Sequence, residues 1–306
     1  MRHALCVLLA AMAILMSACG GKDEPAAGKP TVFVSILPQA YLAERIAGGH
    51  VDVKVLVGPG DNPHSYEPTP KQMVRLGQAR ALLTVGMPFQ TSLLEKLTLH
   101  EQLRIVDTRQ GITLEPMVAH DEHDDHAHHH HARDDHGHAA GEMDPHVWMS
   151  PRLAGRIAAN IADALAEIDP AHAEDFQANL ADLQADLNAL DGEIARALEP
   201  LKGRTFYVYH PAFGYFARRY GLVQEAVEIG GKSPGPRHVK ELIDRAKADG
   251  VRVVFVQPQF SDKAARTIAA QIDGAVVPID PLARDYISNL QSVAATISQA
   301  LSPDEE

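Results

Sequence analysis

The sequence predicts an α/β protein of two lobes, each a mainly parallel sheet flanked by helices, with one long backbone helix joining them. Two observations support this fold class. Short β-branched runs alternate with helical patterns in two separate stretches of the chain, as in βαβ units. A long amphipathic stripe lies between those stretches. The length of 306 residues suits two lobes, predicted at 31–169 and 203–306 around a linking helix within 170–202.

Each lobe is predicted from four apolar runs separated by helical stretches. In the N-terminal lobe the predicted strands are 31–36, 52–57, 81–85 and 103–106, with helices near 39–48, 70–79 and 90–98. In the C-terminal lobe the predicted strands are 205–209, 223–229, 252–256 and 275–279, with helices near 212–219, 237–249, 262–272 and 286–300. Because strands that alternate with helices pair in parallel, each lobe should hold one mainly parallel sheet.

The linker is predicted to be one helix over 171–199, bracketed by Pro170 and Pro200. Such a helix is about 40 Å long and would pass along both lobes. Its large apolar residues recur in steps of three and four and so share one face. They are Phe176, Leu180, Leu183, Leu187, Leu190, Ile194 and Leu198. A dimeric coiled-coil seam is the alternative interpretation, but both flanks are globular, so we expect a monomer. Because a helix resists bending more than loops do, the two lobes should move little relative to each other.

Residues 1–18 have the features of an export signal. A short basic start precedes the apolar run 4–16, which is too short to span a bilayer as a helix. Cys19 follows two small residues, which resembles a bacterial lipoprotein signal in which this cysteine is lipidated. Residues 19–30 are rich in glycine, proline and charge and are expected to form a flexible tether. We therefore predict an exported lipoprotein, membrane-anchored at a periplasmic or cell-surface face; plain secretion with a spare cysteine is the alternative.

The charge and the histidines of the chain are unevenly distributed. The formal net charge of −12 argues against a nucleic-acid partner, because a duplex would be repelled. The segment 117–144 has no apolar periodicity and combines imidazoles with carboxylates, which suit zinc, nickel and copper. We predict a metal-collecting loop; a solvated acidic loop is the alternative. Its histidines are His120, His123, His126, His128, His129, His130, His131, His136 and His138.

Three further histidines lie on irregular backbone beside a regular element. His64 follows Pro63 in a loop after a predicted strand, His146 precedes a predicted helix, and His210 ends a predicted strand. Prolines restrict all three loops, and ligands of open α/β sheets gather outside the carboxyl ends of the strands. Two of these histidines come from the first lobe and one from the second, so they could converge in a cleft between the lobes.

Four separated motifs carry a resemblance to a known family. PHSYEPTP, DPHVWMSP and YHPAFGYFARRYGL, with Asp280-Pro281 after AVVPI, occur in the order found in the metal-binding solute receptors of ABC-type zinc and manganese importers. The resemblance covers 31–300. It implies one metal bound between two lobes, with His64 and His146 as first-lobe ligands and His210 and Asp280 at the second-lobe positions. Histidine at position 210 and the His/Asp loop resemble the zinc type.

The resemblance also implies partners: an ABC permease and its ATPase subunit, with Zn²⁺ as the transported ligand and Mn²⁺ less favoured. Three imidazoles and an oxygen make a good zinc set. Asp280 is expected either to ligate directly or to stand behind a water, and its alternative role is capping the helix after Pro281. An enzyme is not expected, because the chain lacks HExxH and an obvious general base. A periplasmic metal buffer or adhesin, and a Mn²⁺-preferring receptor, are the alternative functions.

Overall fold

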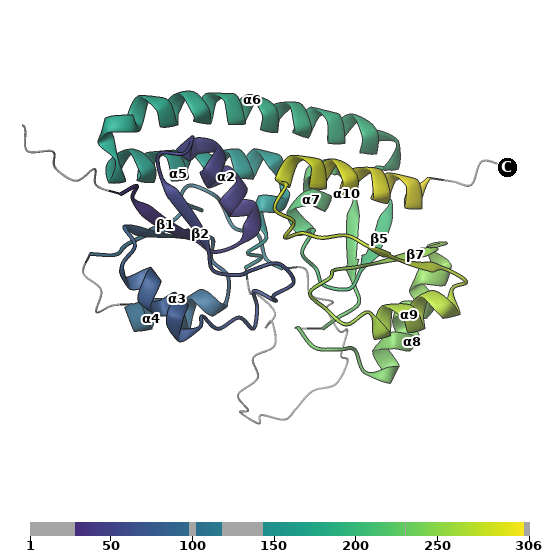
Figure 1. Ribbon diagram of the computed structural model, residues 1–306. Helices are drawn as coiled ribbons and strands as arrows, with labels where there is room; N and C mark the ends of the chain where they lie inside the picture. The colour runs from purple at the N-terminus through teal and green to yellow at the C-terminus, as the bar shows by residue number, and fades with distance from the viewer. Residues whose placement is uncertain (1–27, 98–101, 118–142, 230, 303–306) are drawn as a thin grey trace, which may run out of the picture.

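The computed structural model describes residues 28–97, 102–117, 143–229 and 231–302. The predicted signal peptide, Cys19, most of the tether and the nine histidines of the 117–144 segment lie outside these residues. The described chain forms two four-stranded sheets with a layer of long helices across both of them (Figure 1). This arrangement agrees with the predicted fold class.

The first sheet contains only parallel pairs, in the order β2-β1-β3-β4. Its strands are β1 (Thr31–Val34), β2 (Asp52–Val55), β3 (Ala81–Thr84) and β4 (Arg104–Asp107). Its helices are α2 (Leu37–Ala47), α3 (Pro70–Gly77) and α4 (Phe89–Leu97). The central strand β3 is buried along its whole length, as expected of a parallel sheet covered on both faces.

The second sheet repeats this topology in the order β6-β5-β7-β8, again with parallel pairs only. Its strands are β5 (Thr205–Val208), β6 (Val223–Ala226), β7 (Val253–Val256) and β8 (Ala275–Pro278). Its helices are α7 (Gly214–Tyr220), α8 (Pro236–Ala248) and α9 (Lys263–Gln271). The predicted strand 223–229 ends as a regular strand at Ala226, but the pairing continues, since the N–H of Glu228 donates to the carbonyl of Tyr209 at 3.0 Å.

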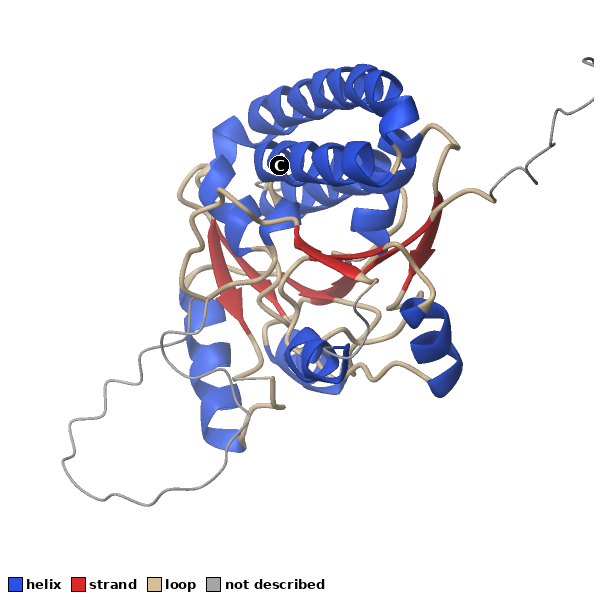
Figure 2. Cartoon of the chain, turned by 90° about the vertical axis from the view of Figure 1, so that its left-hand side faces the viewer, coloured by secondary structure: helices blue, strands red, loops and turns tan. Residues whose placement is uncertain are grey.

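Three long helices form the layer that joins the lobes: α5 (Pro151–Ile168), α6 (Ala173–Leu198) and α10 (Tyr286–Leu301). Helix α6 passes along both lobes in Figure 1, and Figure 2 shows the layer above the strands. All seven apolar residues of the predicted stripe are buried on α6. Short 3-10 turns, η2 (Pro170–His172) and η3 (Glu199–Leu201), replace the ends of the predicted 171–199 helix. Within the described residues, every helix is too short or too polar to cross a lipid bilayer.

The strand orders fix where a ligand can bind. In each sheet the chain first adds a strand on one side of the starting strand and then crosses to the other side. The reversal leaves a crevice outside the carboxyl ends of β1 and β3 in one lobe and of β5 and β7 in the other. His210 follows β5 at such a crevice, and η1 (Val147–Met149) brings the chain from the first lobe to meet it.

Candidate metal centre

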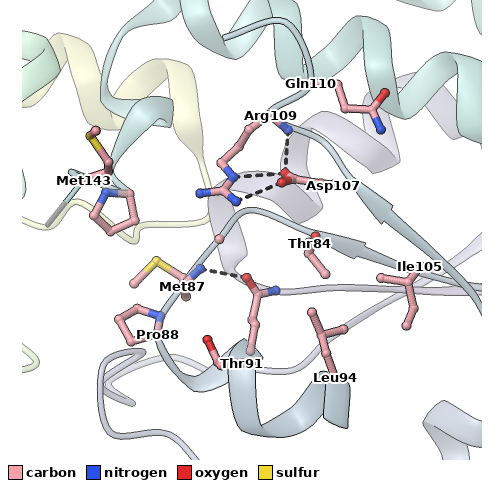
Figure 3. Close-up of a pocket in the computed structure, with 13 residues that line it drawn as sticks. Thr84, Met87, Pro88, Thr91, Leu94, Ile105, Asp107, Arg109, Gln110 and Met143 are labelled. Atoms are coloured by element: carbon pink, nitrogen blue, oxygen red, sulfur yellow. Dashed lines mark hydrogen bonds and ion pairs between the residues drawn. The ribbon is translucent and has the colours of Figure 1, made fainter. Parts of the chain in front are cut away.

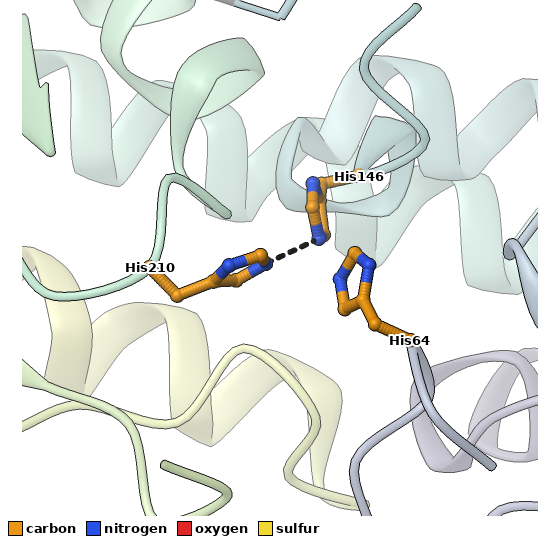
Figure 4. A group of neighbouring side chains, drawn as sticks. All are labelled: His64, His146 and His210. Carbon is orange, nitrogen blue, oxygen red and sulfur yellow. Dashed lines mark hydrogen bonds between the residues drawn. The ribbon is translucent and has the colours of Figure 1, made fainter. Parts of the chain in front are cut away.

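Three histidines from distant parts of the chain meet between the lobes (Figure 4). One ring nitrogen of each of His64, His146 and His210 lies within 4.8 Å of the others. The Nε2 atoms of His146 and His210 are 3.2 Å apart. Two nitrogens bound to one tetrahedral zinc at the usual bond length would be separated by about 3.3 Å. Within the described part of the chain, no other group of three or more metal-ligating side chains is this close.

His64 lies in the loop between β2 and α3, and this loop is anchored at both ends. The Tyr66 hydroxyl donates to the Leu56 carbonyl, just after β2, at 2.6 Å. A capping box between Thr69 and Gln72 starts α3, and Gln72 Nε2 donates to the Tyr66 oxygen at 2.6 Å. The backbone N–H of His64 donates to Asn62 Oδ1 at 2.9 Å. These contacts fix the backbone that carries the His64 ring.

His146 is oriented by an acidic residue two positions earlier. Asp144 Oδ1 accepts from the backbone N–H of His146 at 2.9 Å and contacts His146 Nδ1 at 2.7 Å. Both side chains are nearly inaccessible to solvent, with 2% of Asp144 and 3% of His146 exposed. The following 3-10 turn is tied to the second lobe, since Trp148 Nε1 donates to the Pro281 carbonyl at 2.8 Å. His146 therefore sits at the junction of the two lobes.

His210 is held by two side chains of its own lobe. The amide of Gln257 accepts from the His210 N–H at 3.0 Å and donates to the His210 carbonyl at 2.9 Å. Glu228 Oε1 lies 2.6 Å from His210 Nδ1, and the Glu228 side chain is 1% exposed. Phe260 stacks on the His210 ring with centroids 4.6 Å apart and an interplanar angle of 20°. The continued pairing of Glu228 with Tyr209 places this carboxylate beside His210.

The two carboxylates determine which ring nitrogens can bind a metal. A carboxylate accepts hydrogen bonds, so Asp144 and Glu228 favour the Nδ1–H form of His146 and His210. In that form each ring carries its lone pair on Nε2, and the two Nε2 atoms face each other at 3.2 Å. Both are then available to a cation placed between them. The buried carboxylates also supply negative charge close to a divalent ion that would be bound by neutral imidazoles.

Sequence reasoning did not assign a role to either carboxylate. Asp144 opens the DPHVWMSP motif, and its position two residues before a histidine is the sequence signal that marks it as a candidate partner of that ring. Glu228 is 18 residues from His210 in sequence, and only the pairing of neighbouring strands brings them together. The register between β5 and β6 brings Glu228 beside His210. Composition and the spacing of residues along the chain carry no signal for this contact.

Asp280 is not part of the three-histidine group. Its Oδ1 accepts from the N–H of Leu282 at 2.9 Å and from Gln259 Nε2 at 2.9 Å. Its carbonyl accepts from Asn289 Nδ2 at 2.7 Å. The Leu282 contact closes the turn at Pro281, but α10 begins only at Tyr286 after Asp285, so Asp280 does not cap that helix. Gln259 lines the same pocket as the three histidines.

Apolar and aromatic side chains enclose the histidines. Trp148 lies edge-on to His146 with ring centroids 5.2 Å apart, and Leu282 and Phe260 line the same pocket. Tyr209 is not among the lining residues; its ring packs against Phe260, and its hydroxyl lies 3.3 Å from Ser233 Oγ. The enclosure excludes bulk water and suits capture of a single ion rather than an organic ligand.

A second, larger pocket opens at the carboxyl ends of β3 and β4 (Figure 3). Its charged groups satisfy each other, since Arg109 Nε and Nη2 donate to the two carboxylate oxygens of Asp107 at 3.0 and 2.8 Å. Burial opposes ionisation of Asp107, but these hydrogen bonds outweigh it and lower the pKa of its carboxyl. Among the residues that the structure describes, the lining contains no histidine and no acidic residue other than Asp107. It therefore does not compete with the three histidines as a metal site.

Replacing Glu228 with glutamine should weaken zinc binding about tenfold, the lower range for loss of an outer hydrogen-bond partner of a ligand. The amide keeps the shape and can still accept from His210 Nδ1, but it removes the charge. Competition with a chromophoric chelator measures the change. Glu225→Gln is the matched control on the same segment, because Glu225 faces Arg245 at 3.2 Å instead of a histidine. Equal affinities for the two variants would contradict a role of Glu228 at the metal.

Comparison with known proteins agrees with this geometry. The model of one protein family, described as "Zinc-uptake complex component A periplasmic", matches residues 32–300. A crystal structure of a protein named ZnuA superposes with a TM-score of 0.80 and 42% sequence identity, covering 89% of this chain and 99% of that chain.

Two curated relatives are similar at the level of sequence. The high-affinity zinc uptake system protein ZnuA of Yersinia pestis is 29% identical over 286 residues, which cover 88% of each protein. The zinc-binding protein AdcA of Streptococcus pyogenes (serotype M3) is 30% identical over 270 residues, or 85% of this chain. The match spans 52% of that streptococcal protein, so the chain corresponds to about half of its length.

Proposed function

The chain belongs to the family of periplasmic zinc-uptake components, a family of receptors and not of enzymes, and we propose that it captures Zn²⁺ between its lobes for import. The observation that carries this proposal is the meeting of His64, His146 and His210 from both lobes. Because the ligands come from both lobes, a small relative shift of the lobes would change the ligand geometry, which suits binding followed by release.

The donor set favours zinc over manganese. We assign His64, His146 and His210 as the protein ligands, each through one imidazole nitrogen. Three imidazoles suit zinc, whereas the harder Mn²⁺ prefers more carboxylate oxygen. An oxygen would complete the tetrahedron. Asp280 lies outside the three-histidine group, so we propose a water in that position, with Asp280 behind it.

We propose the transport partners of this chain from the family to which it belongs. An uptake component needs a membrane permease and an ATPase subunit, and we propose that the zinc-loaded receptor docks on such a permease as a monomer. The export signal at 1–18, lipidation of Cys19 and the tether would keep the folded lobes at the outer face of a membrane. The histidines of the 117–144 segment would raise the local zinc concentration.

Zinc uptake separates this proposal from a metal buffer or an adhesin with the same site. A strain that lacks the gene should grow poorly under zinc limitation. The native gene should restore both growth and uptake of radioactive zinc, and His210→Ala should restore neither. Uptake that is independent of the gene would favour the buffer or adhesin and contradict import.

Removing residues 118–142 should leave the tight zinc site intact. The chain on either side is already closed, because Pro116 and Met143 form an antiparallel bridge and the Asp144 N–H donates to the Glu115 carbonyl at 2.8 Å. A short glycine linker can therefore replace the segment. Isothermal titration should show one tight zinc per chain and loss of the weaker additional sites. Loss of the tight site would mean that the cleft histidines are not sufficient.

A further inference from the structure

The carboxylate that orients His146 is itself contacted by the other lobe. Asp144 belongs to the chain that leaves the first lobe, yet three residues of helix α7 of the second lobe surround it: Gly214, Tyr215 and Arg218. We call these three residues the α7 brace. The same helix begins four residues after His210. One element of the second lobe is thus connected to two of the three histidines.

The brace contacts both the backbone carbonyl and the carboxylate of Asp144. Tyr215 donates its hydroxyl proton to the Asp144 carbonyl at 3.2 Å and accepts from the Glu115 N–H at 2.9 Å. Arg218 Nη2 lies 3.7 Å from Asp144 Oδ2, while Asp144 Oδ1 contacts His146. Gly214 lies so near that a Cβ there would come within 2.6 Å of Asp144 Oδ2. Glycine is thus required for this approach, and Asp144 has little room to rotate.

We propose that the α7 brace positions Asp144, and through it the His146 imidazole, so that Nε2 of His146 points at the metal only while the second lobe is seated on the first. This inference rests on the proposed zinc site and adds positioning residues to it. A small displacement of the second lobe would shift His210 and loosen the carboxylate that orients His146 in the same movement. Zinc would then lose two well-oriented ligands together, which favours its release.

Two substitutions test the brace in the full-length protein. Gly214→Ala should push the Asp144 carboxylate and weaken zinc binding about tenfold, as expected when a ligand loses its outer partner. Arg218→Met removes the guanidinium that lies 3.7 Å from the same carboxylate oxygen. Because this contact is long, the loss should be about threefold, below the range for a direct partner of a ligand, and Arg218→Lys should recover most of it. Arg237→Met is the control for the change in charge, since Arg237 pairs with Glu241 on the exposed side of α8.

A second readout distinguishes positioning from general damage. In zinc-free protein, ¹H–¹⁵N spectra of the ring nitrogens should show His146 in the Nδ1–H form, with its signal identified by its loss in His146→Ala. Gly214→Ala should shift part of this signal to the Nε2–H form, while thermal unfolding confirms that the variant is folded. If Gly214→Ala does not fold, the zinc affinities and His146 signals of Arg218→Met and Arg218→Lys test the brace instead.

The proposed role of the α7 brace is contradicted if the folded variants bind zinc within twofold of the native protein and keep the native His146 signal. The proposed function fails in a different way. In that case the native protein would lack tight zinc binding, or His146→Ala would bind zinc as well as the native protein.

Discussion

Replacing His210 with alanine should weaken zinc binding by more than about 100-fold, because losing a ligand costs more than losing one of the outer partners, for which 10–100-fold is typical. His210 supplies an Nε2 atom 3.2 Å from that of His146, and alanine removes it. The remaining two imidazoles cannot complete a tetrahedral set without extra water. Competition against a high-affinity chelator measures the loss.

His238→Ala is the matched control in the same lobe. His238 lies in α8, where its Nδ1 is 3.9 Å from Glu241, and it does not belong to the three-histidine group. Its replacement should change zinc affinity less than twofold. Similar losses for the two variants would contradict the assignment of His210 as a ligand. Both variants should be tested without residues 118–142, so that weaker sites do not mask the difference.

Replacing Asp191 with asparagine should lower the free energy of unfolding by about 2 kcal/mol, within the range for leaving a hydrogen-bonded group unsatisfied, because the Arg219 side chain is 29% exposed and keeps part of its hydration. Asp191 is a buried acid on α6 and accepts from Arg219 of α7 at 2.8 and 2.5 Å. It also accepts from Tyr220 at 3.2 Å. Asparagine keeps the size but leaves the Arg219 charge without its partner. Denaturant unfolding of zinc-free protein measures the loss.

The pH dependence of this loss has a defined sign. Burial opposes ionisation of Asp191, but the hydrogen bonds and charges of Arg219 and Arg152 outweigh it, so its pKa in the folded protein lies below the ordinary 3.8. The contribution of the carboxylate is therefore complete above pH 3.8 and is lost as the pH falls through the lowered pKa. The difference between native protein and Asp191→Asn should be constant near neutral pH and shrink in acid.

Asp186→Asn provides the control on the same helix. Asp186 pairs with Arg45 at 2.7 Å, but its side chain is 51% exposed, so the pair should contribute less than about 1 kcal/mol. A loss as large for Asp186→Asn as for Asp191→Asn would show that any acid on α6 has this effect. It would contradict a specific connection from α6 to α7.

The fold could be predicted because its signals are local. Parallel strands covered on both faces are continuous apolar runs, and the α6 stripe repeats at the period of a helix. Helix α5 was expected after Pro151 but its extent was not predicted. Its buried face includes the small residues Ala154, Ala158 and Ala162, which give a weaker apolar signal than leucine.

The site was predictable only in part. The histidines lie in proline-restricted loops within recognisable motifs, and the structure brings three of them together. The expectation that Asp280 stands with them depended on the family resemblance alone; its carboxylate lies outside the three-histidine group and accepts from Gln259 and Leu282. Glu228 and Phe260 could not be assigned from sequence, because their contacts with His210 depend on strand pairing and on the loop after β7.

The most direct test of a zinc site shared by both lobes is anomalous diffraction at the zinc absorption edge. Crystals of the zinc-loaded protein lacking 118–142 should give one strong peak between the lobes. That peak should lie about 2.0–2.1 Å from one ring nitrogen each of His64, His146 and His210. A zinc ion bound by the residues of one lobe alone, or one that omits any of these three rings, would contradict the account.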